Sequence, residues 1–189
     1  ERCGPFVDGF VINVSSPNTP NLRELQKDED LSRIIIEVQK YSGNKPVLIK
    51  LAPDLGNMQI KSIVDTAMDL GCAGIVATNT TVERPDEEGV MKQNGGLSGL
   101  PLRNRSTEVI RLIADHTDGQ WPIIGVGGIS SSDDAWEKII NGASLVQIYS
   151  AMVFEGAGVI KKIVNGLDRR LKQAGLDSLD QAVGLARRE

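Results

Sequence analysis

Short apolar runs alternate with helical patterns along the whole chain, and this alternation restricts the fold more than any other feature. Each run is rich in valine, isoleucine or leucine and is bounded by glycine, proline or polar residues, as expected of buried β-strands. The predicted strands are Gly9–Val14, Val47–Leu51, Gly74–Ala77, Ile123–Gly125 and Leu145–Ile148. Strands that alternate with helices form parallel sheets with right-handed crossovers, so the sequence predicts an α/β fold.

The segments between the strands carry apolar residues at helical spacing. Within Asp28–Lys40, acidic residues at the start and an apolar stripe of leucine, isoleucine and valine predict an amphipathic helix. Three further helices are predicted after N-caps: from Asn57 to Leu70, from Ser106 to His116 and from Ser132 to Asn141. An amphipathic helix is predicted over Val159–Ala174, and a short final helix over Asp177–Arg188. Gly71 and Gly142 are predicted to end two of these helices.

Five strands are too few to close a (β/α)₈ barrel, which needs eight strands and typically ~250 residues. Either the sheet is open, or the first three βα units lie on sequence that is absent from these 189 residues, and we favour the second alternative. The chain begins with Glu1 rather than methionine, so we expect a fragment or a processed chain. The predicted fold is the C-terminal portion of a (β/α)₈ TIM barrel, in which residues 1–189 form part of one domain with about five βα units.

Charge and composition argue against several kinds of partner. The formal net charge of -4 gives no general attraction to nucleic acid, and no apolar run approaches the ~20 residues of a membrane span. Cys3 and Cys72 lack metal-ligand spacing, so no metal site is expected and a reducing, intracellular compartment is favoured. His116, the only histidine, is expected at a helix end, and no nucleophile-elbow motif supports a Ser-His-Asp triad.

Polar side chains follow three predicted strands at the point where each strand ends. After the first strand, the polar residues around Pro17 are Asn13, Ser15, Ser16, Asn18 and Thr19. Lys50 lies at the end of the second strand, and Thr78–Thr81 follow the third. Parallel strands present their carboxyl ends at one rim, so these side chains are expected to share a site. Taken singly, these features are also compatible with an ordinary turn after the first strand, a lysine that reaches solvent and a cap of the third loop.

Two glycine-rich turns, Gly95–Gly99 and Gly125–Ser130, suit the binding of phosphate by backbone N–H groups. Neither is the dinucleotide fingerprint G-x-G-x-x-G. They flank the penultimate predicted strand, where barrels commonly hold phosphate. The first lies within Thr78–Arg105, a long connection without clear periodicity, and connections of this length are usually functional.

The ordered motifs NVSSPN, LIKLAPD, TNTT, GGLSG, IIGVGGI and LVQIYS resemble the C-terminal part of class 2 dihydroorotate dehydrogenases. The resemblance extends from about Phe10 to Gly184. It implies an FMN-containing (β/α)₈ barrel that oxidises dihydroorotate to orotate and passes the electrons to a quinone. Class 1 relatives carry cysteine where Ser16 stands, so Ser16 favours class 2 and a quinone acceptor.

The resemblance also implies roles for individual residues. Ser16 would be the catalytic base. The substrate ring would be bound by Asn13, Asn18, Asn79 and Thr80. FMN would be contacted by Asn13, Lys50, Thr78, Gly99, Gly127, Gly128, Tyr149 and Ser150, the last five of them around the ribityl phosphate.

The chemistry of this reaction fits the residue types. Dihydroorotate must lose a proton from one ring carbon and a hydride from its neighbour, and FMN supplies the hydride acceptor. A base is therefore needed across the ring from the flavin, on a loop that excludes water. Serine is a poor base by itself, so Ser16 needs a proton relay or strong polarisation that the sequence does not show.

The family's N-terminal membrane-associating helices lie outside these residues. The resemblance implies a peripheral membrane protein attached through that region, expected at the bacterial cytoplasmic membrane, with the mitochondrial inner membrane as the alternative. Two other functions remain open at this point. A dihydrouridine synthase-like FMN barrel would want a basic face and a catalytic cysteine, and a non-catalytic half-barrel would not need so many polar strand-end residues.

Overall fold

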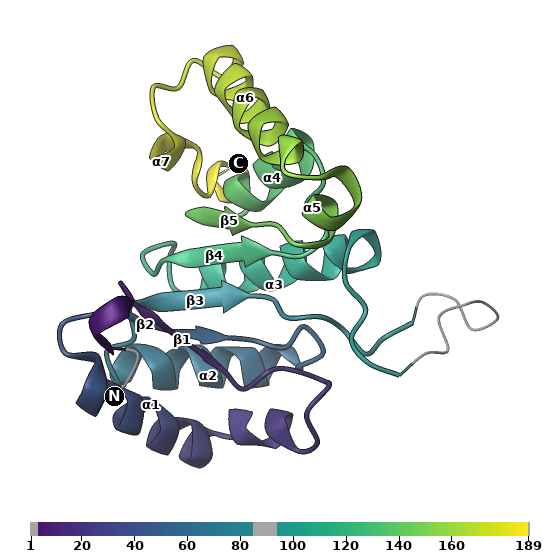
Figure 1. Cartoon of the computed structure of the whole chain (residues 1–189). Coiled ribbons are helices and arrows are strands. Elements are labelled where there is room, and N and C mark those ends of the chain that lie inside the picture. The colour runs from purple at the N-terminus through teal and green to yellow at the C-terminus, as the bar shows by residue number, and fades with distance from the viewer. Residues whose placement is uncertain (1–3, 85–93, 189) are drawn as a thin grey trace.

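The computed structural model describes residues 4–84 and 94–188 of the chain, and its centre is one parallel sheet (Figure 1). The strands are β1 (Phe10–Asn13), β2 (Val47–Lys50), β3 (Gly74–Ala77), β4 (Ile123–Val126) and β5 (Leu145–Gln147). They are ordered as in the sequence, and all neighbouring pairs are parallel. The five predicted strands are therefore confirmed to within one residue at each end.

The helices pack around the outside of the sheet (Figure 1). Each of the first four strands is followed by one long helix: α1 (Asp28–Ser42), α2 (Asn57–Asp69), α3 (Arg103–His116) and α4 (Ser132–Ile140). The chain ends in α5 (Ser150–Glu155), α6 (Gly158–Gln173) and α7 (Leu179–Ala182). Short 3-10 turns are η1 (Gly4–Phe6), η2 (Leu22–Gln26), η4 (Leu100–Leu102) and η5 (Leu185–Arg187). None of the helices in these described ranges has the length and apolar character that a membrane crossing needs.

Two predicted N-caps are displaced by one residue. Helix α2 begins at Asn57 itself, and the capping position is Gly56, whose N–H donates to the Gln59 side chain at 3.1 Å. Helix α4 begins at Ser132 and is capped by Ser131. In both helices the first turn contains a side chain that reaches back to the residue before the predicted cap, and this reciprocal bonding decides the boundary.

The predicted N-cap at Ser106 is wrong by a larger margin. Helix α3 begins at Arg103, inside the predicted loop Thr78–Arg105, so Ser106 lies within the helix. Its hydroxyl donates to the carbonyl oxygen of Val126 at 2.8 Å and so links α3 to β4. A serine inside a helix is tolerated here because its side chain bonds to the sheet and not to a helix end.

The main core lies between the helices and the face of the sheet that they cover. Ile49, Ile75 and Ile123 project from the three central strands into this core and are fully buried. The other face of the sheet is less covered. Val11, predicted to be buried, is 47% exposed, because it alternates with Ile12 and points away from the helices.

The strand register aligns the functional end of the sheet. Asn13 pairs with Lys50 across β1 and β2, and Val126 pairs with Gln147 across β4 and β5. All five strands therefore end at the same rim, and the loops that leave them converge there. This is the edge at which α/β barrels place their active sites.

The two outer strands give a testable property of this chain. Residues 1–189 expressed alone should self-associate, because β1 and β5 each have one strand neighbour in the described structure and expose Val11 and Leu145. Sedimentation velocity should show a concentration-dependent increase in size. The double variant Val11→Lys/Leu145→Lys should reduce it, whereas Ile36→Lys, at an exposed position of α1, should not. A monomer at all concentrations would contradict this prediction.

Candidate active site

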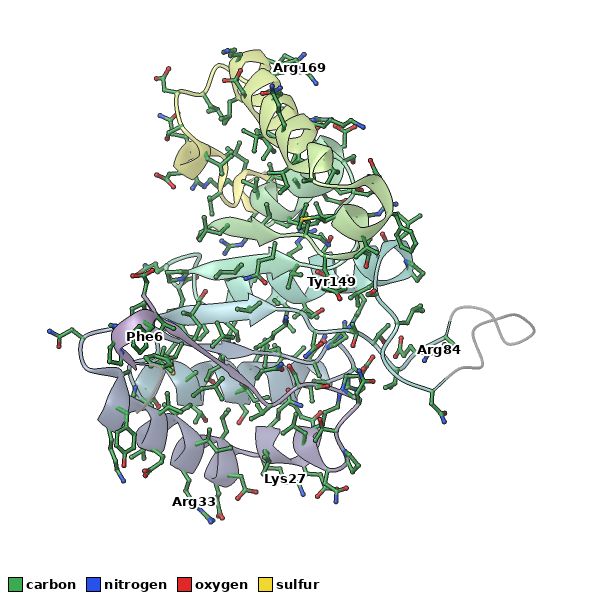
Figure 2. All side chains as sticks on the ribbon, viewed as in Figure 1. Phe6, Lys27, Arg33, Arg84, Tyr149 and Arg169 are labelled. Atoms are coloured by element: carbon green, nitrogen blue, oxygen red, sulfur yellow. The ribbon has the colours of Figure 1, made fainter. Side chains whose placement is uncertain are left out.

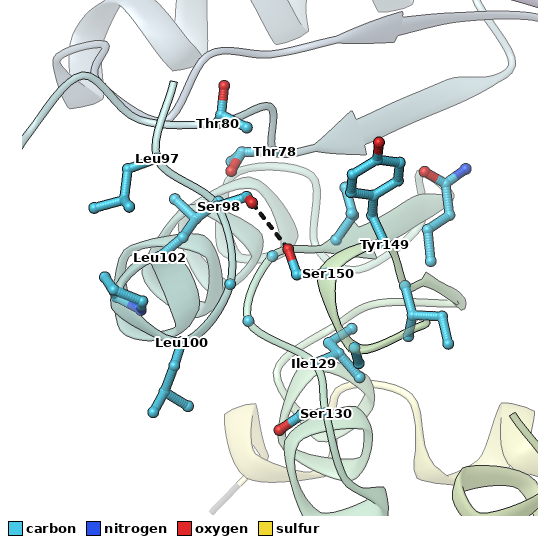
Figure 3. A pocket seen from close by; sticks show the side chains of 18 of the residues that line it. Thr78, Thr80, Leu97, Ser98, Leu100, Leu102, Ile129, Ser130, Tyr149 and Ser150 are labelled. Atoms are coloured by element: carbon cyan, nitrogen blue, oxygen red, sulfur yellow. Dashed lines mark hydrogen bonds between the residues drawn. The ribbon is translucent and has the colours of Figure 1, made fainter. Parts of the chain in front are cut away.

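A cavity of about 980 Å³ opens at the carboxyl ends of β2 to β5 (Figure 3). Its walls come from Lys50, Thr78–Thr80, Gly96–Leu102, Val126–Ser130 and Gln147–Ala151, with Phe154 and Glu155 of α5. Its size lies at the upper end of the ~300–1,000 Å³ typical of small-molecule and cofactor sites. Loops far apart in the sequence thus form one concave site because the parallel strands end together.

Most of the predicted site residues line this cavity. They are Lys50, Thr78, Asn79, Thr80, Gly99, Gly127, Gly128, Tyr149 and Ser150. The other predicted residues, Asn13, Ser16 and Asn18, lie on the β1 side and are connected to the cavity through hydrogen bonds. The roles of all these residues stay predictions, whereas their positions are observed.

Asn13 and Asn79 form a hydrogen-bonded pair across the sheet. The Asn79 Nδ2 donates to Asn13 Oδ1 at 3.1 Å and to Ser15 Oγ at 3.0 Å, and the Thr80 N–H donates to Asn79 Oδ1 at 2.8 Å. These bonds hold the Asn79 amide in one orientation. Ser15, which was assigned no role from the sequence, is fully buried and also donates to Asn13 Oδ1. Its position two residues after Asn13, just beyond the strand, was the available signal.

The loop that carries Ser16 packs against the glycine-rich turn before Leu97. Ser16 Oγ accepts the Asn18 N–H at 3.3 Å, and Asn18 Oδ1 accepts the Gly96 N–H at 3.2 Å. A Cβ at Gly96 would collide with Thr80 Oγ1 and lie 2.8 Å from Pro17 Cγ. Only glycine fits between the two loops, so Gly96 allows the Ser16 loop and Thr80 to approach each other.

Lys50 brings a half-buried ammonium group to the cavity. It ends β2 on the less covered face of the sheet, and burial lowers its pKa. Desolvation of this kind disfavours the charged form unless a polar or electron-rich group lies nearby. A ligand with partial or full negative charge near Lys50 would offset that cost.

The opposite end of the cavity is formed by glycine-rich turns. Gly99, Gly127 and Gly128 have positive φ angles of 79°, 129° and 69°, which favour glycine. A Cβ on Gly128 would lie 2.8 Å from the backbone nitrogen of Arg103, so the turn packs directly on the start of α3. Consecutive backbone N–H groups in such turns form anion-binding concavities.

Two hydroxyl side chains and one aromatic ring complete this end. The Ser98 and Ser150 hydroxyl oxygens lie 2.8 Å apart and join the glycine-rich turn before η4 to the start of α5 (Figure 3). Tyr149 is 74% exposed (labelled in Figure 2), and its side chain lines the cavity in Figure 3. The donor set of a lysine, threonines, glycine N–H groups and a serine therefore fits an elongated ligand with a polar ring at one end and a phosphate at the other.

Asp134 supports the anion-binding end from behind. Its carboxylate accepts the N–H groups and hydroxyls of Ser130 and Ser131 and a 2.9 Å ion pair from Arg103. Burial alone would raise the pKa of Asp134, but these hydrogen bonds lower it to about 2. The aspartate thus holds the turn after Gly128 against the start of α3.

Lys138 is a second buried charge in this region that sequence reasoning missed. It is fully buried, and its Nζ donates to the Arg103 carbonyl oxygen and to Thr107 Oγ1, both at 2.6 Å. Burial lowers its pKa to about 8. The sequence signal for a buried charge was a lysine in the apolar stripe of α4. Its hydrogen-bond acceptors lie on α3, so the sequence of α4 alone could not identify them.

The remaining chemistry-bearing residues stand apart from the cavity. His116 lies in the last turn of α3, as predicted, and its Nε2 is 2.6 Å from Asp65 Oδ1. Cys72 is a buried free thiol whose pKa burial raises to about 11, and Cys3 lies outside the described residues. Within residues 4–84 and 94–188, no three His, Cys, Asp or Glu side chains gather as a possible metal site.

Comparison with known proteins identifies the family. Residues 1–171 match the family described as dihydroorotate dehydrogenase. The chain belongs to the dihydroorotate dehydrogenase family. The resemblance drawn from the motifs is therefore confirmed, and the dihydrouridine synthase alternative loses its support.

Individual relatives match nearly all of this chain, but the chain matches only about half of each relative. It is 46% identical over 196 residues to the dihydroorotate dehydrogenase (quinone) of Trichodesmium erythraeum and 49% identical over 187 residues to that of Gloeobacter violaceus. Each alignment covers 98% of this chain, but only 51% and 53% of those relatives. The chain thus spans about half the length of the curated relatives it matches.

A comparison with solved structures also matches the chain to about half of a longer protein. The crystal structure of the Eimeria tenella enzyme in complex with ferulenol superposes with a TM-score of 0.94 at 34% identity, covering 100% of this chain and 56% of that chain. The predicted fold class is confirmed: the chain is an α/β fold of five parallel strands, consistent with part of a (β/α)₈ barrel.

The hydrogen bonds to Asp134 predict a pH-dependent contribution to stability. Because its folded-state pKa of about 2 lies below the ordinary 3.8, the contribution is present above about pH 4 and is lost as the pH falls towards 2. In the full-length protein, Asp134→Asn should lower the free energy of unfolding by about 2 kcal/mol at pH 7.

Urea unfolding between pH 7 and pH 3 measures this difference, which should shrink as the pH falls. Asp133→Asn is the matched control, because its side chain is 72% exposed. An equal loss of stability in both variants, or a difference that does not change with pH, would contradict the assignment.

Proposed function

We propose that this chain is the C-terminal part of the FMN-binding barrel of a quinone-dependent dihydroorotate dehydrogenase. The complete enzyme would oxidise (S)-dihydroorotate to orotate, the fourth step of de novo pyrimidine biosynthesis, and pass the electrons to a quinone. The observation that carries the proposal is the bonded pair Asn13–Asn79, with Thr80, beside a cavity lined by Lys50. Neutral amides suit the imide and amide edges of a pyrimidine, which they can both donate to and accept from.

The cavity supports FMN as the cofactor. Lys50 and Thr78 would face the flavin ring, and Asn13 would touch its edge from β1. Gly99, Gly127, Gly128, Tyr149 and Ser150 would surround the ribityl phosphate, because they supply backbone donors, a hydroxyl and a ring at the far end. When bound, FMN accepts the hydride and hands two electrons to the quinone.

The protein side chains would bind the ring and remove the proton. Asn13, Asn18, Asn79 and Thr80 would hold the pyrimidine, and their mutual bonds keep their amides oriented before the substrate arrives. Ser16 Oγ would take the ring proton while its own hydroxyl proton passes to solvent. It accepts the Asn18 N–H, and a positioned donor of this kind stabilises negative charge on the hydroxyl oxygen as the proton moves.

The quinone acceptor suggests a location. Quinones dissolve in membranes, so we propose a peripheral membrane protein attached through a region outside this chain, at the bacterial cytoplasmic membrane. The mitochondrial inner membrane is the alternative. Cell fractionation of the full-length protein tests this, and recovery in the membrane fraction that salt or mild detergent releases is the expected result.

Lys50 gives a test of the cofactor site. Lys50→Ala in the full-length protein should deplete bound FMN or slow flavin reduction by dihydroorotate, because the ammonium offsets negative charge at the ring. The flavin absorbance per polypeptide and an anaerobic stopped-flow trace measure the two effects. Lys45→Ala is the matched control, since Lys45 lies before the opposite end of β2 and bonds to the Gly4 carbonyl. Normal FMN content and normal reduction in Lys50→Ala would exclude the role.

Ser16 gives the decisive test of the reaction. Ser16→Ala should keep near-normal FMN content and orotate binding, because the amide pair and the cavity stay intact. Flavin reduction by dihydroorotate should fall at least ~10²–10⁴-fold, the contribution of a positioned base. Reoxidation by quinone should hardly change, since no substrate proton is removed in that step.

Ser16→Cys should recover part of the reduction rate, most visibly at higher pH, because a thiol ionises more readily than a hydroxyl. Stopped-flow measurement of the two half-reactions separates the outcomes. If Ser16→Ala slows reoxidation alone, or leaves reduction unchanged, another group removes the proton.

A further inference from the structure

One guanidinium group joins three of the loops that leave the sheet. Arg23 Nη1 forms a 2.7 Å ion pair with Asp54 Oδ2, its Nε donates to the Ser15 carbonyl oxygen at 3.1 Å, and its Nη2 donates to the Thr80 carbonyl oxygen at 3.0 Å. These acceptors belong to the loops after β1, β2 and β3. Ser15 is next to Ser16, the predicted base, and Thr80 is one of the predicted substrate-binding residues.

The carboxylate of Asp54 makes further bonds on its other side. It accepts the hydroxyl of Thr81 and, at 3.1 Å, the N–H of Val82. The Arg23 and Asp54 side chains are only 23% and 14% exposed, so their interaction is less screened than a surface ion pair. The pair therefore ties the loop after β3 to the loop after β1 through the loop between them.

The segment that presents Arg23 is itself anchored. Arg23 lies in η2, where the buried Gln26 side chain donates to the Arg23 carbonyl oxygen and accepts the Ala52 N–H, both at 3.2 Å. The η2 turn is thus attached to the loop after β2 at two places, by Gln26 to Ala52 and by Arg23 to Asp54. The guanidinium is held in position before any ligand binds.

We propose that the Arg23–Asp54 pair positions the Ser16 loop against Thr80, so that the base and the ring-binding groups keep their relative placement during proton removal. This inference rests on the proposed function. Both residues act through others and are positioning residues. The physical need is clear, because the ladder of a parallel sheet stops at the strand ends and leaves the loops beyond it to be aligned by side chains. A displacement of ~1 Å of a catalytic group can cost ~10²-fold in rate.

Two variants of the full-length, FMN-loaded enzyme test the role. Arg23→Lys keeps the positive charge but cannot reach three acceptors at once. Asp54→Asn keeps the volume but turns one of its two acceptor oxygens into a donor. Asp115→Asn is the matched control: its 2.6 Å ion pair with the largely buried Arg187 joins α3 to η5, away from the cavity.

Arg23→Lys and Asp54→Asn should slow flavin reduction by dihydroorotate at least ~10-fold and raise the KM for dihydroorotate. FMN content and reoxidation by quinone should stay within about twofold of the wild type, because the phosphate-end contacts are untouched. Amide hydrogen exchange should speed up at Asn18 and Leu22, on the loop that Arg23 holds. The control should change none of these quantities.

Combining each variant with Ser16→Ala separates positioning from a general loss of structure. If the pair acts through the base, Arg23→Lys should slow reduction much less in the Ser16→Ala background than in the wild type. Equal slowing in both backgrounds, or loss of FMN in proportion to loss of rate, would overturn the proposal. A wild type that dihydroorotate does not reduce would overturn the proposed function, whereas an active wild type with unaffected variants would overturn the positioning role alone.

Discussion

The parallel register of the sheet is the constraint on which the site depends. Because Asn13 pairs with Lys50 and Val126 with Gln147, the last residues of the strands lie in one row. Residues separated by up to about half of the chain thereby reach one cavity. Beyond the strand ends, the backbone hydrogen bonds of the sheet no longer align the loops, and hydrogen bonds of polar side chains do so instead. Arg23 and Asp54 connect the loops near β1, and Asp134 and Lys138 connect those near β4. Buried charges are costly unless fully bonded, and each of these has several partners.

Much of the fold could be predicted from sequence because its signals are local. Short valine- and isoleucine-rich runs between glycines or prolines predicted all five strands, and apolar stripes predicted the long helices. The helix starts were harder. Ser106 looked like a cap but bonds to β4, and the short helix α5 has too few residues to show a periodic stripe. For Ser106 a tertiary contact, which no local pattern contains, decided the helix boundary.

The site was predictable where its residues stand at strand ends in recognisable motifs. Lys50, Thr78, Asn79 and the glycine turns all line the cavity. What escaped prediction depends on partners distant in sequence. Ser15 is buried between two asparagines, Asp54 bonds to Arg23, and Lys138 bonds to α3. Such residues look ordinary in the sequence, because a buried polar group reveals its purpose only through its hydrogen-bond partners.

The central claim is that the amides and hydroxyls at the ends of β1 and β3 bind a pyrimidine ring beside FMN. A crystal structure of the full-length protein with FMN and orotate tests this most directly. We expect the orotate ring within hydrogen-bond distance of the Asn13, Asn18, Asn79 and Thr80 side chains, between Ser16 and a flavin that lies against Lys50. An orotate bound elsewhere, or a flavin phosphate away from Gly99 and Gly128, would contradict it.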